Sequence, residues 1–91
     1  MATQPNLDEI IEYPLAFPIK VMGKASDAFV PLVVDIVRRH APDWDESHLQ
    51  TRPSSKGTYL SLTATIIARD RAQLDALYTE LTAHPMIAYV L

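Results

Sequence analysis

The sequence predicts an α+β fold of the ferredoxin-like type: a four-stranded antiparallel sheet with two helices on one face, preceded by a short extra N-terminal helix. Apolar residues alternate with other residues over 17–22 and 60–67, which is typical of strands with one buried face. They recur at helical spacing over 29–37 and 74–81. Shorter strand-like segments follow the first of these helices and end the chain. The resulting order, β-α-β-β-α-β, places both helices on the same side of the sheet when the crossovers are right-handed.

The chain has 91 residues, which is enough for one domain and leaves little room for two. Residues 1–5 are polar and include a proline, so we expect a disordered tail followed by a single ferredoxin-like domain over 6–91. Asn6 has the character of an N-cap for a short helix over 7–12. Pro14 ends that helix, because the residue before a proline is disfavoured in the helical conformation.

Two prolines constrain the first strand and the first long helix. Pro18 lies within the strand over 17–22 and is expected where its missing N–H does no harm. Ser26 or Asp27 is expected to cap the following helix. Pro31 would lie slightly too deep in a helix that begins there, so we expect either a later start or an irregular first turn.

The second half of the chain contains a hairpin, a helix and a final strand. Residues 43–47 form an acidic loop that contains the only tryptophan, and a strand follows the loop. A tight turn at 53–57 connects this strand to the one over 60–67. Asp70 is expected to cap the last helix, and the apolar run 86–91 to form the closing strand.

The alternation pattern assigns the two faces of the sheet. The open face, which the helices leave uncovered, is expected to carry Lys20, Ser61, Thr63 and Thr65. The core is expected to centre on apolar side chains of the long strands and both helices: Phe17, Ile19, Val21, Val33, Ile36, Val37, Leu60, Leu62, Ile66, Leu74, Leu77 and Leu81.

Composition excludes several classes of protein. The net charge of −3 and the sequence pI of about 5.4 argue against nucleic-acid binding, which normally requires a basic face. The absence of cysteine excludes disulfides and thiolate metal sites. No apolar run approaches the roughly 18 residues of a membrane span, and the N-terminus lacks the pattern of a signal peptide. We therefore expect a cytoplasmic protein that binds neither nucleic acid nor membranes.

Catalytic patterns known on this fold do not match the sequence. Acylphosphatase-like enzymes use an arginine in the loop after the first strand, together with an asparagine. Here that loop is Gly23-Lys24-Ala25, and the only asparagine is Asn6. Ser54 and Ser55 have no histidine nearby in sequence and no nucleophile-elbow pattern. Because no set of acid, base and nucleophile is visible, the sequence predicts a non-catalytic protein without a cofactor.

The segment from His40 to His48 has the composition of a metal site but not its spacing. It matches no zinc pattern and lacks the glycine of a calcium loop. We interpret it as a solvated acidic loop, with His40 stabilising the C-terminal end of a helix.

The turn Pro53-Ser54-Ser55-Lys56-Gly57 carries the candidate binding site. Proline fixes φ, glycine permits positive φ, and the serines can hydrogen-bond their own backbone. The N–H groups could form an anion-binding nest beside the cations of Arg52 and Lys56. The other interpretation is an ordinary surface hairpin with solvated charges. The candidate binding residues are Arg52, Ser54, Ser55, Lys56, Gly57 and Tyr59.

A combination of short segments resembles a known family. The segments are Tyr13-Pro14 with Phe17, Lys20-Val21-Met22-Gly23, Val37 with Arg39-His40-Ala41-Pro42, the turn 53–57 with Tyr59, and the closing Val90-Leu91. Together they resemble the YbeD-like family of small bacterial proteins, an uncharacterised family of the UPF class whose signature is the Pro-Ser-Ser-Lys-Gly turn. The resemblance implies a fold similar to ACT-type regulatory domains and no established enzymatic activity.

Two functional hypotheses follow. The first is a non-catalytic regulatory module of the bacterial cytosol that binds a small effector, as ACT-type domains do. The alternative is a protein–protein adapter that docks an acidic partner at the 52–59 turn, because arginine and tyrosine are favoured interface anchors. The partner is thus an unknown protein or a small-molecule effector. A homodimer is also compatible with the resemblance, since ACT-type domains often pair through sheet edges or faces.

Overall fold

The structure is a computed structural model that describes residues 12–91 of the chain. Its elements are β1 (Leu15–Lys24), α2 (Phe29–His40), the 3₁₀ turn η1 (Glu46–His48), β2 (Leu49–Pro53), β3 (Tyr59–Ala68), α3 (Arg71–Ala83) and β4 (Ile87–Val90). The tail predicted for 1–5 lies outside the described residues. So does the helix predicted over 7–12, apart from Glu12, which is not helical.

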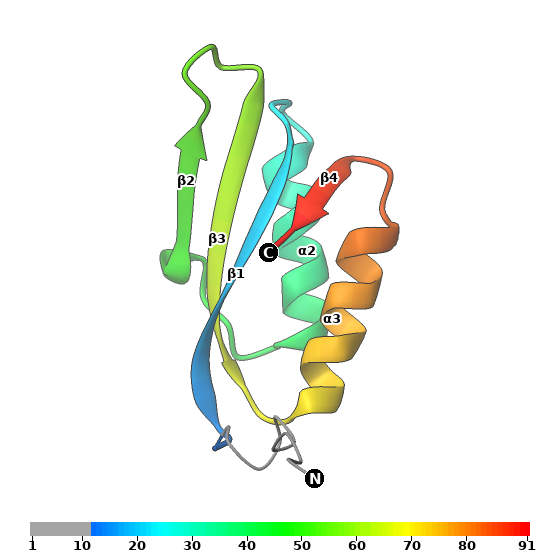
Figure 1. The fold of residues 1–91 in the computed structure, drawn as a ribbon. Coiled ribbons are helices and arrows are strands. Elements are labelled where there is room, and N and C mark those ends of the chain that lie inside the picture. The colour runs from blue at the N-terminus through cyan, green and yellow to red at the C-terminus, as the bar shows by residue number, and fades with distance from the viewer. Residues whose placement is uncertain (1–11) are drawn as a thin grey trace, which may run out of the picture.

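The strands form one four-stranded antiparallel sheet in the order β2-β3-β1-β4. Figure 1 shows both helices on the same side of this sheet, and the turn between β2 and β3 projecting beyond the helical layer. β1 lies at the centre, between β3 and β4, although all three are far apart in sequence. This arrangement confirms the predicted ferredoxin-like fold.

The pairing of β1 with β3 decides which side chains face the helices. It joins all ten residues of each strand without a bulge. Val21 lies opposite Leu62, and both side chains are fully buried. Lys20 lies opposite Thr63 on the other face, since successive side chains alternate between faces. The open face therefore carries the polar residues predicted for it: Lys20, Ser61, Thr63 and Thr65.

Pro18 is tolerated in a central strand because of the side on which its nitrogen lies. Lys20 exchanges both of its backbone hydrogen bonds with Leu91, at N···O distances of 3.2 and 2.8 Å. Alternate residues of an antiparallel strand bond to the same neighbour, so the nitrogen of Pro18 also faces the β4 side. The pairing with that side does not extend as far as Pro18. The missing N–H therefore breaks no ladder bond, as expected.

The first long helix begins later than either candidate cap. α2 starts at Phe29 after Ala28, so the predicted side-chain capping by Ser26 or Asp27 is wrong. The carbonyl of Ser26 instead accepts a hydrogen bond from the Phe29 N–H at 3.2 Å. This start puts Pro31 at the third helical position, where a backbone N–H has no partner within the helix. The later start, one of the two predicted alternatives, accommodates the proline.

The second long helix begins as predicted. The Oδ1 atom of Asp70 accepts a hydrogen bond from the Gln73 N–H at 2.8 Å, which satisfies one of the free donors of the first turn of α3. The helix ends at Ala83, before Pro85, and β4 follows. Among residues 12–91, no helix is long and apolar enough to cross a membrane.

The core fills the middle of the space between the sheet and the helices. Most of the predicted core residues are buried, but Phe17 and Leu60 are only partly so. Helices of 12 and 13 residues are about 18–20 Å long. The strands of ten residues, at about 3.3 Å each, span about 33 Å. Phe17 and Leu60 lie toward opposite ends of the sheet, where the strands extend past the helices.

Two aromatic residues outside the predicted core are buried. Phe29 is fully buried, and Trp44 keeps an exposed fraction of only 7%. The neighbouring Asp43 and Asp45 are exposed, so the acidic loop is solvated as predicted except at its tryptophan. The backbone N–H of Trp44 donates to the carbonyl of Ala41 at 2.9 Å. This turn brings the indole back onto the core after α2 ends.

Glu80 on α3 contacts the C-terminal end of α2 through two polar interactions. It accepts a hydrogen bond from Nε2 of His40 at 2.7 Å and forms an ion pair with Arg39. The hydrogen bond from His40 and the positive charge of Arg39 together lower the pKa of the Glu80 carboxyl below its ordinary 4.5. Beside this pair, Nε2 of Gln73 donates to the carbonyl of His40 at 2.8 Å. The contact between the helices is thus partly polar.

Truncation of the core should destabilise the protein according to the face that a residue occupies. Leu62→Ala is expected to lower the free energy of unfolding by about 2–5 kcal/mol, because the side chain is fully buried. The control is Ile67→Ala on the open face of the same strand. Its side chain is 59% exposed, and the change should stay within about 0.5 kcal/mol. Urea denaturation followed by circular dichroism measures both, and equal midpoints would refute the β1–β3 register.

The lowered pKa of Glu80 predicts how the stability of the protein changes as the pH falls. A carboxylate whose pKa is depressed by folding stabilises the fold above its ordinary value, and this contribution is lost as the pH falls through the lowered value. Glu80→Gln should therefore be less stable than the wild type at neutral pH, by about 1 kcal/mol at most because the pair is partly exposed. The two stabilities should converge in acid. Urea titrations at successively lower pH test this, and a constant difference would contradict it.

Candidate functional site

Ser54 organises the turn between β2 and β3. Its N–H donates to the Tyr59 carbonyl at 2.9 Å, and its carbonyl accepts from the Gly57 N–H at 2.9 Å. Its Oγ also accepts from the Tyr59 N–H at 3.1 Å. Gly57 has a φ of +73°, the left-handed conformation that the sequence predicted for it. Three N–H groups, those of Ser54, Gly57 and Tyr59, therefore already donate within the turn.

The tip of the turn is separate from the strands that support it. Ser55, Lys56 and Gly57 are all exposed, and Figure 1 shows this loop extending past the other elements. Pro53 is the last residue of β2 and not part of the turn proper. Within residues 12–91, the Lys56 ammonium forms no ion pair. The tip therefore offers one solvated cation.

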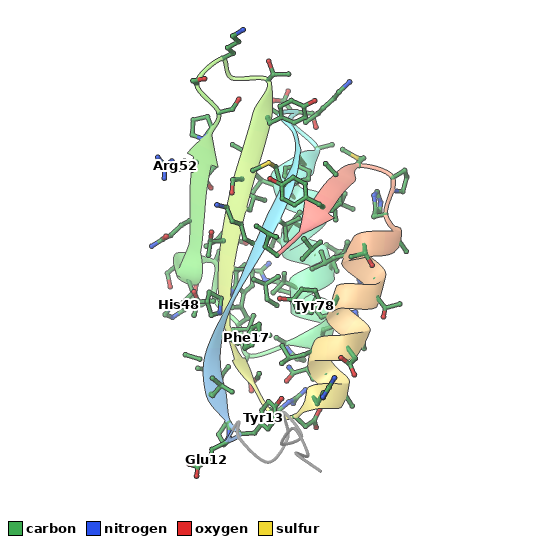
Figure 2. The ribbon with its side chains drawn as sticks, viewed as in Figure 1. Glu12, Tyr13, Phe17, His48, Arg52 and Tyr78 are labelled. Atoms are coloured by element: carbon green, nitrogen blue, oxygen red, sulfur yellow. The ribbon has the colours of Figure 1, made fainter. Side chains whose placement is uncertain are left out.

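A hollow lies on the open face of the sheet below this turn, and we call it the open-face hollow. It has a volume of about 280 Å³ and is lined by Lys20, Met22, Arg52, Pro53, Ser54, Tyr59 and Ser61. The strand register explains the gathering, because Ser61 of β3 pairs with Met22 on one side and with Arg52 on the other. The register places Arg52 on the open face with Ser61, and Figure 2 shows its side chain extending outward past the edge of β2.

The open-face hollow is positively charged within an acidic chain. Its lining contains the two cations Lys20 and Arg52 and no carboxylate, whereas the net charge of the chain is −3. In the described part of the chain, neither cation forms an ion pair. Lys24 adds a third positive charge on the same face, opposite Tyr59. An anion placed here would meet attraction from several directions.

The structure divides the predicted site residues into two groups. Arg52, Ser54 and Tyr59 line the hollow, while Ser55, Lys56 and Gly57 lie at the tip outside it. The list of candidate binding residues missed four lining residues: Lys20, Met22, Pro53 and Ser61. The signal was present in part, because the alternation placed Lys20 and Ser61 on the open face. Only the strand register shows that they lie beside Arg52.

The lining of the hollow limits the chemistry that its side chains can support. Its polar groups are two cations, two serine hydroxyls and a phenol, with neither a histidine nor a carboxylate to serve as a general base near neutral pH. Among residues 12–91, no three His, Cys, Asp or Glu side chains gather as a metal site requires. The arrangement can hold an anion against an apolar floor formed by Met22, Pro53 and the ring of Tyr59.

Comparison with known sequences finds similarity along nearly the whole chain. Residues 8–91 match the family described as Protein of unknown function (DUF493). A UPF0250 protein of Janthinobacterium sp. (strain Marseille) is 55% identical over 84 residues, which cover 92% of each chain. A UPF0250 protein of Neisseria gonorrhoeae is 45% identical over 91 residues and covers 100% of both chains. These matches confirm the predicted resemblance to an uncharacterised family of the UPF class.

Comparison with solved structures supports the fold. The H. pylori protein HP0495 superposes with a TM-score of 0.75 at 11% identity, covering 99% of this chain and 90% of that one. The ACT domain from the GTP pyrophosphokinase of Chlorobium tepidum superposes with a TM-score of 0.64 at 12% identity, covering 84% and 81%. At such low identity the likeness concerns the fold alone, and it confirms the ACT-like architecture.

Proposed function

This chain belongs to the DUF493 family, and we propose that it is a non-catalytic regulatory module that binds a small anionic effector in the open-face hollow. The observation that carries the proposal is the convergence of Lys20 and Arg52 on a hollow lined by no carboxylate. An arginine guanidinium can bind a carboxylate or phosphate through two parallel hydrogen bonds, and a lysine adds a mobile point charge.

The rest of the lining restricts the size and character of the effector. Met22 and the ring of Tyr59 provide apolar surface beside the two cations. The volume of about 280 Å³ lies near the lower end of the range for small-molecule pockets, about 300–1,000 Å³. An effector that suits this site has one or two acidic groups and a short apolar part.

The similarity in fold is consistent with a regulatory role. The structurally similar ACT domain from Chlorobium tepidum is part of a larger protein, a GTP pyrophosphokinase. The ACT-type resemblance adds the expectation that such modules act by binding effectors. The lining of the open-face hollow, which holds no acid–base pair, favours this role over catalysis.

Removal of the arginine should weaken effector binding, whereas removal of the tip lysine should not. Amide NMR spectra are recorded while lipoate, citrate, succinate, ATP or inorganic phosphate is added. We expect saturable shifts at Met22, Tyr59 and Ser61 with at least one of them. Arg52→Gln should raise the Kd about ten-fold or more, as the loss of a charge-assisted hydrogen bond would.

Lys56→Gln is the matched control, because it removes the same charge from the tip outside the hollow. Its Kd should stay within about two-fold of the wild type, since an exposed and distant charge is largely screened. An absence of saturable shifts with every compound would refute the effector. Equal weakening by both variants would show that general electrostatic attraction, and not the hollow, accounts for binding.

A second function, an adapter for an acidic protein partner, is favoured by the outer edge of β2. This strand ends the sheet and pairs only with β3 in the described structure, so one row of its backbone donors and acceptors is available. Arg52 within the strand and Lys56 beyond it would attract an acidic extended segment.

The tip lysine discriminates the two functions. An extended acidic partner that runs along β2 to the turn should be captured by the wild type and lost with Lys56→Glu, while the variant keeps the wild-type melting temperature. Affinity capture from bacterial cytosol with mass spectrometry measures this. A partner retained equally by Lys56→Glu would count against the adapter and leave the effector proposal intact.

A further inference from the structure

A second hollow lies at the other end of β3, where β2 no longer covers its edge. Pairing between β2 and β3 stops at Leu49 opposite Ala64, and the connection that follows α2 crosses the remaining edge. This hollow, which we call the Trp44 hollow, also has a volume of about 280 Å³. It is lined by Ala16, Ala41, Pro42, Asp43, Trp44, Asp45, His48, Thr65, Ile67, Arg69 and Gln73.

Trp44 gives this hollow an unusual wall. The side chain is 7% exposed, and its Nε1–H donor is buried without a hydrogen-bond partner. Buried donors are nearly always satisfied in proteins, and one that is not is unfavourable. The indole that forms part of the wall of this hollow therefore carries a polar group that the described residues leave unpaired.

The rim of the Trp44 hollow carries charges of both signs. Asp43 and Asp45 come from the connection after α2, and Arg69 comes from the end of β3. Asp45 accepts a hydrogen bond from the Ser47 N–H at 2.9 Å, which lowers the pKa of its carboxyl. Within residues 12–91, neither Asp43 nor the Arg69 guanidinium takes part in an ion pair. Both charges are therefore available to a ligand.

Gln73 holds this end of the site in place. Its Oε1 accepts from the Arg69 N–H at 2.7 Å, and its Nε2 donates to the His40 carbonyl at 2.8 Å. Through these two hydrogen bonds, Gln73 positions the segment that presents Arg69.

We propose that the Trp44 hollow binds a small zwitterion that carries an ammonium group, a carboxylate and an apolar side chain. The ammonium pairs with Asp43 and Asp45, the carboxylate pairs with Arg69, and the apolar group packs against Trp44 and Ile67. This site is distinct from the open-face hollow. It shares no lining residue with it and lies at the other end of β1 from the loop at 23–25.

The mixed charges favour a zwitterion over simpler ligands. A plain anion would be repelled by Asp43 and Asp45, and a plain cation by Arg69. A metal ion would need a cluster of three acidic, histidine or cysteine ligands, which residues 12–91 do not contain. Ala16, Ala41, Pro42 and Ile67 supply the apolar surface that an uncharged part of the ligand requires.

The test uses the tryptophan itself. Trp44 is the only tryptophan of the chain, so its fluorescence reports on this hollow. The full chain is titrated with leucine, methionine and valine, up to about 10 mM. The controls are 3-methylbutylamine and 4-methylpentanoate, which are leucine without its carboxylate and leucine without its ammonium group. We expect a saturable change in Trp44 emission with at least one amino acid. Each control should bind at least about ten-fold more weakly than leucine or give no response.

Two variants locate the charges. Arg69→Gln and Asp43→Asn alter exposed side chains without ion pairs in the described structure, so both should fold, as circular dichroism can verify. Each should weaken amino-acid binding about ten-fold or more. Arg52→Gln, which lies in the other hollow, should leave it unchanged. The proposal is overturned if no amino acid gives a saturable response, if the amine or the acid alone binds as well as leucine, or if both variants bind like the wild type.

Discussion

The uninterrupted pairing of β1 with β3 is the constraint on which the rest of this molecule depends. Ten residues of each strand face one another without a bulge, so the two faces of the sheet stay distinct from end to end. A slip of β1 by one residue would move Val21 to the solvent and Lys20 to the helices. The buried face gives the helices a surface on which to pack. The open face brings Lys20, Met22 and Ser61 to a common position beside Arg52.

Charge separation between the faces follows from the same pairing. The strand residues of the open face include Lys20, Lys24 and Arg52 and no acid, although acidic residues outnumber basic ones in the chain, 11 to 8. Two copies that met through their open faces would set these cations against one another, which is unfavourable. The outer edge of β2 lacks this obstacle. Charge therefore favours an anionic ligand on the face and leaves the edge as the more suitable surface for another chain.

The sequence predicted the fold well because its two kinds of hydrophobic periodicity are unambiguous. Alternation identified the long strands, and helical spacing with the Asp70 cap identified α3. The burial of Trp44 could not be predicted, because two exposed acidic neighbours mark the segment as a loop. The absence of a side-chain cap on α2 was hidden by Ser26 and Asp27, whose residue types suit a cap. Only Pro31 pointed to the later start.

The candidate sites were less predictable than the fold for a physical reason. A hollow is made by residues that meet across strands, and single-sequence patterns describe only residues that are close along one strand or helix. The turn at 53–57 was visible as local chemistry, so Arg52, Ser54 and Tyr59 were identified, while Lys20 and Met22, which come from another strand, were not. The Trp44 hollow draws on still more distant segments, from Ala16 to Gln73.

Gly23 shows how tightly these distant segments are fitted together. A Cβ atom at this position would lie 2.5 Å from the backbone oxygen of Met86 and 2.5 Å from Cε1 of Phe29. Real Cβ atoms do not approach other atoms so closely, and the opposing groups are a backbone carbonyl and a fully buried ring. The absence of a side chain at Gly23 thus lets β1, the start of α2 and the approach to β4 converge.

The pairing of β1 with β4 also shifts register between Met22 and Gly23. The open-face hollow, which includes Met22, is therefore built beside a junction that tolerates little rearrangement. Such rigidity fixes the backbone of β1, from which Lys20 and Met22 extend to line the hollow.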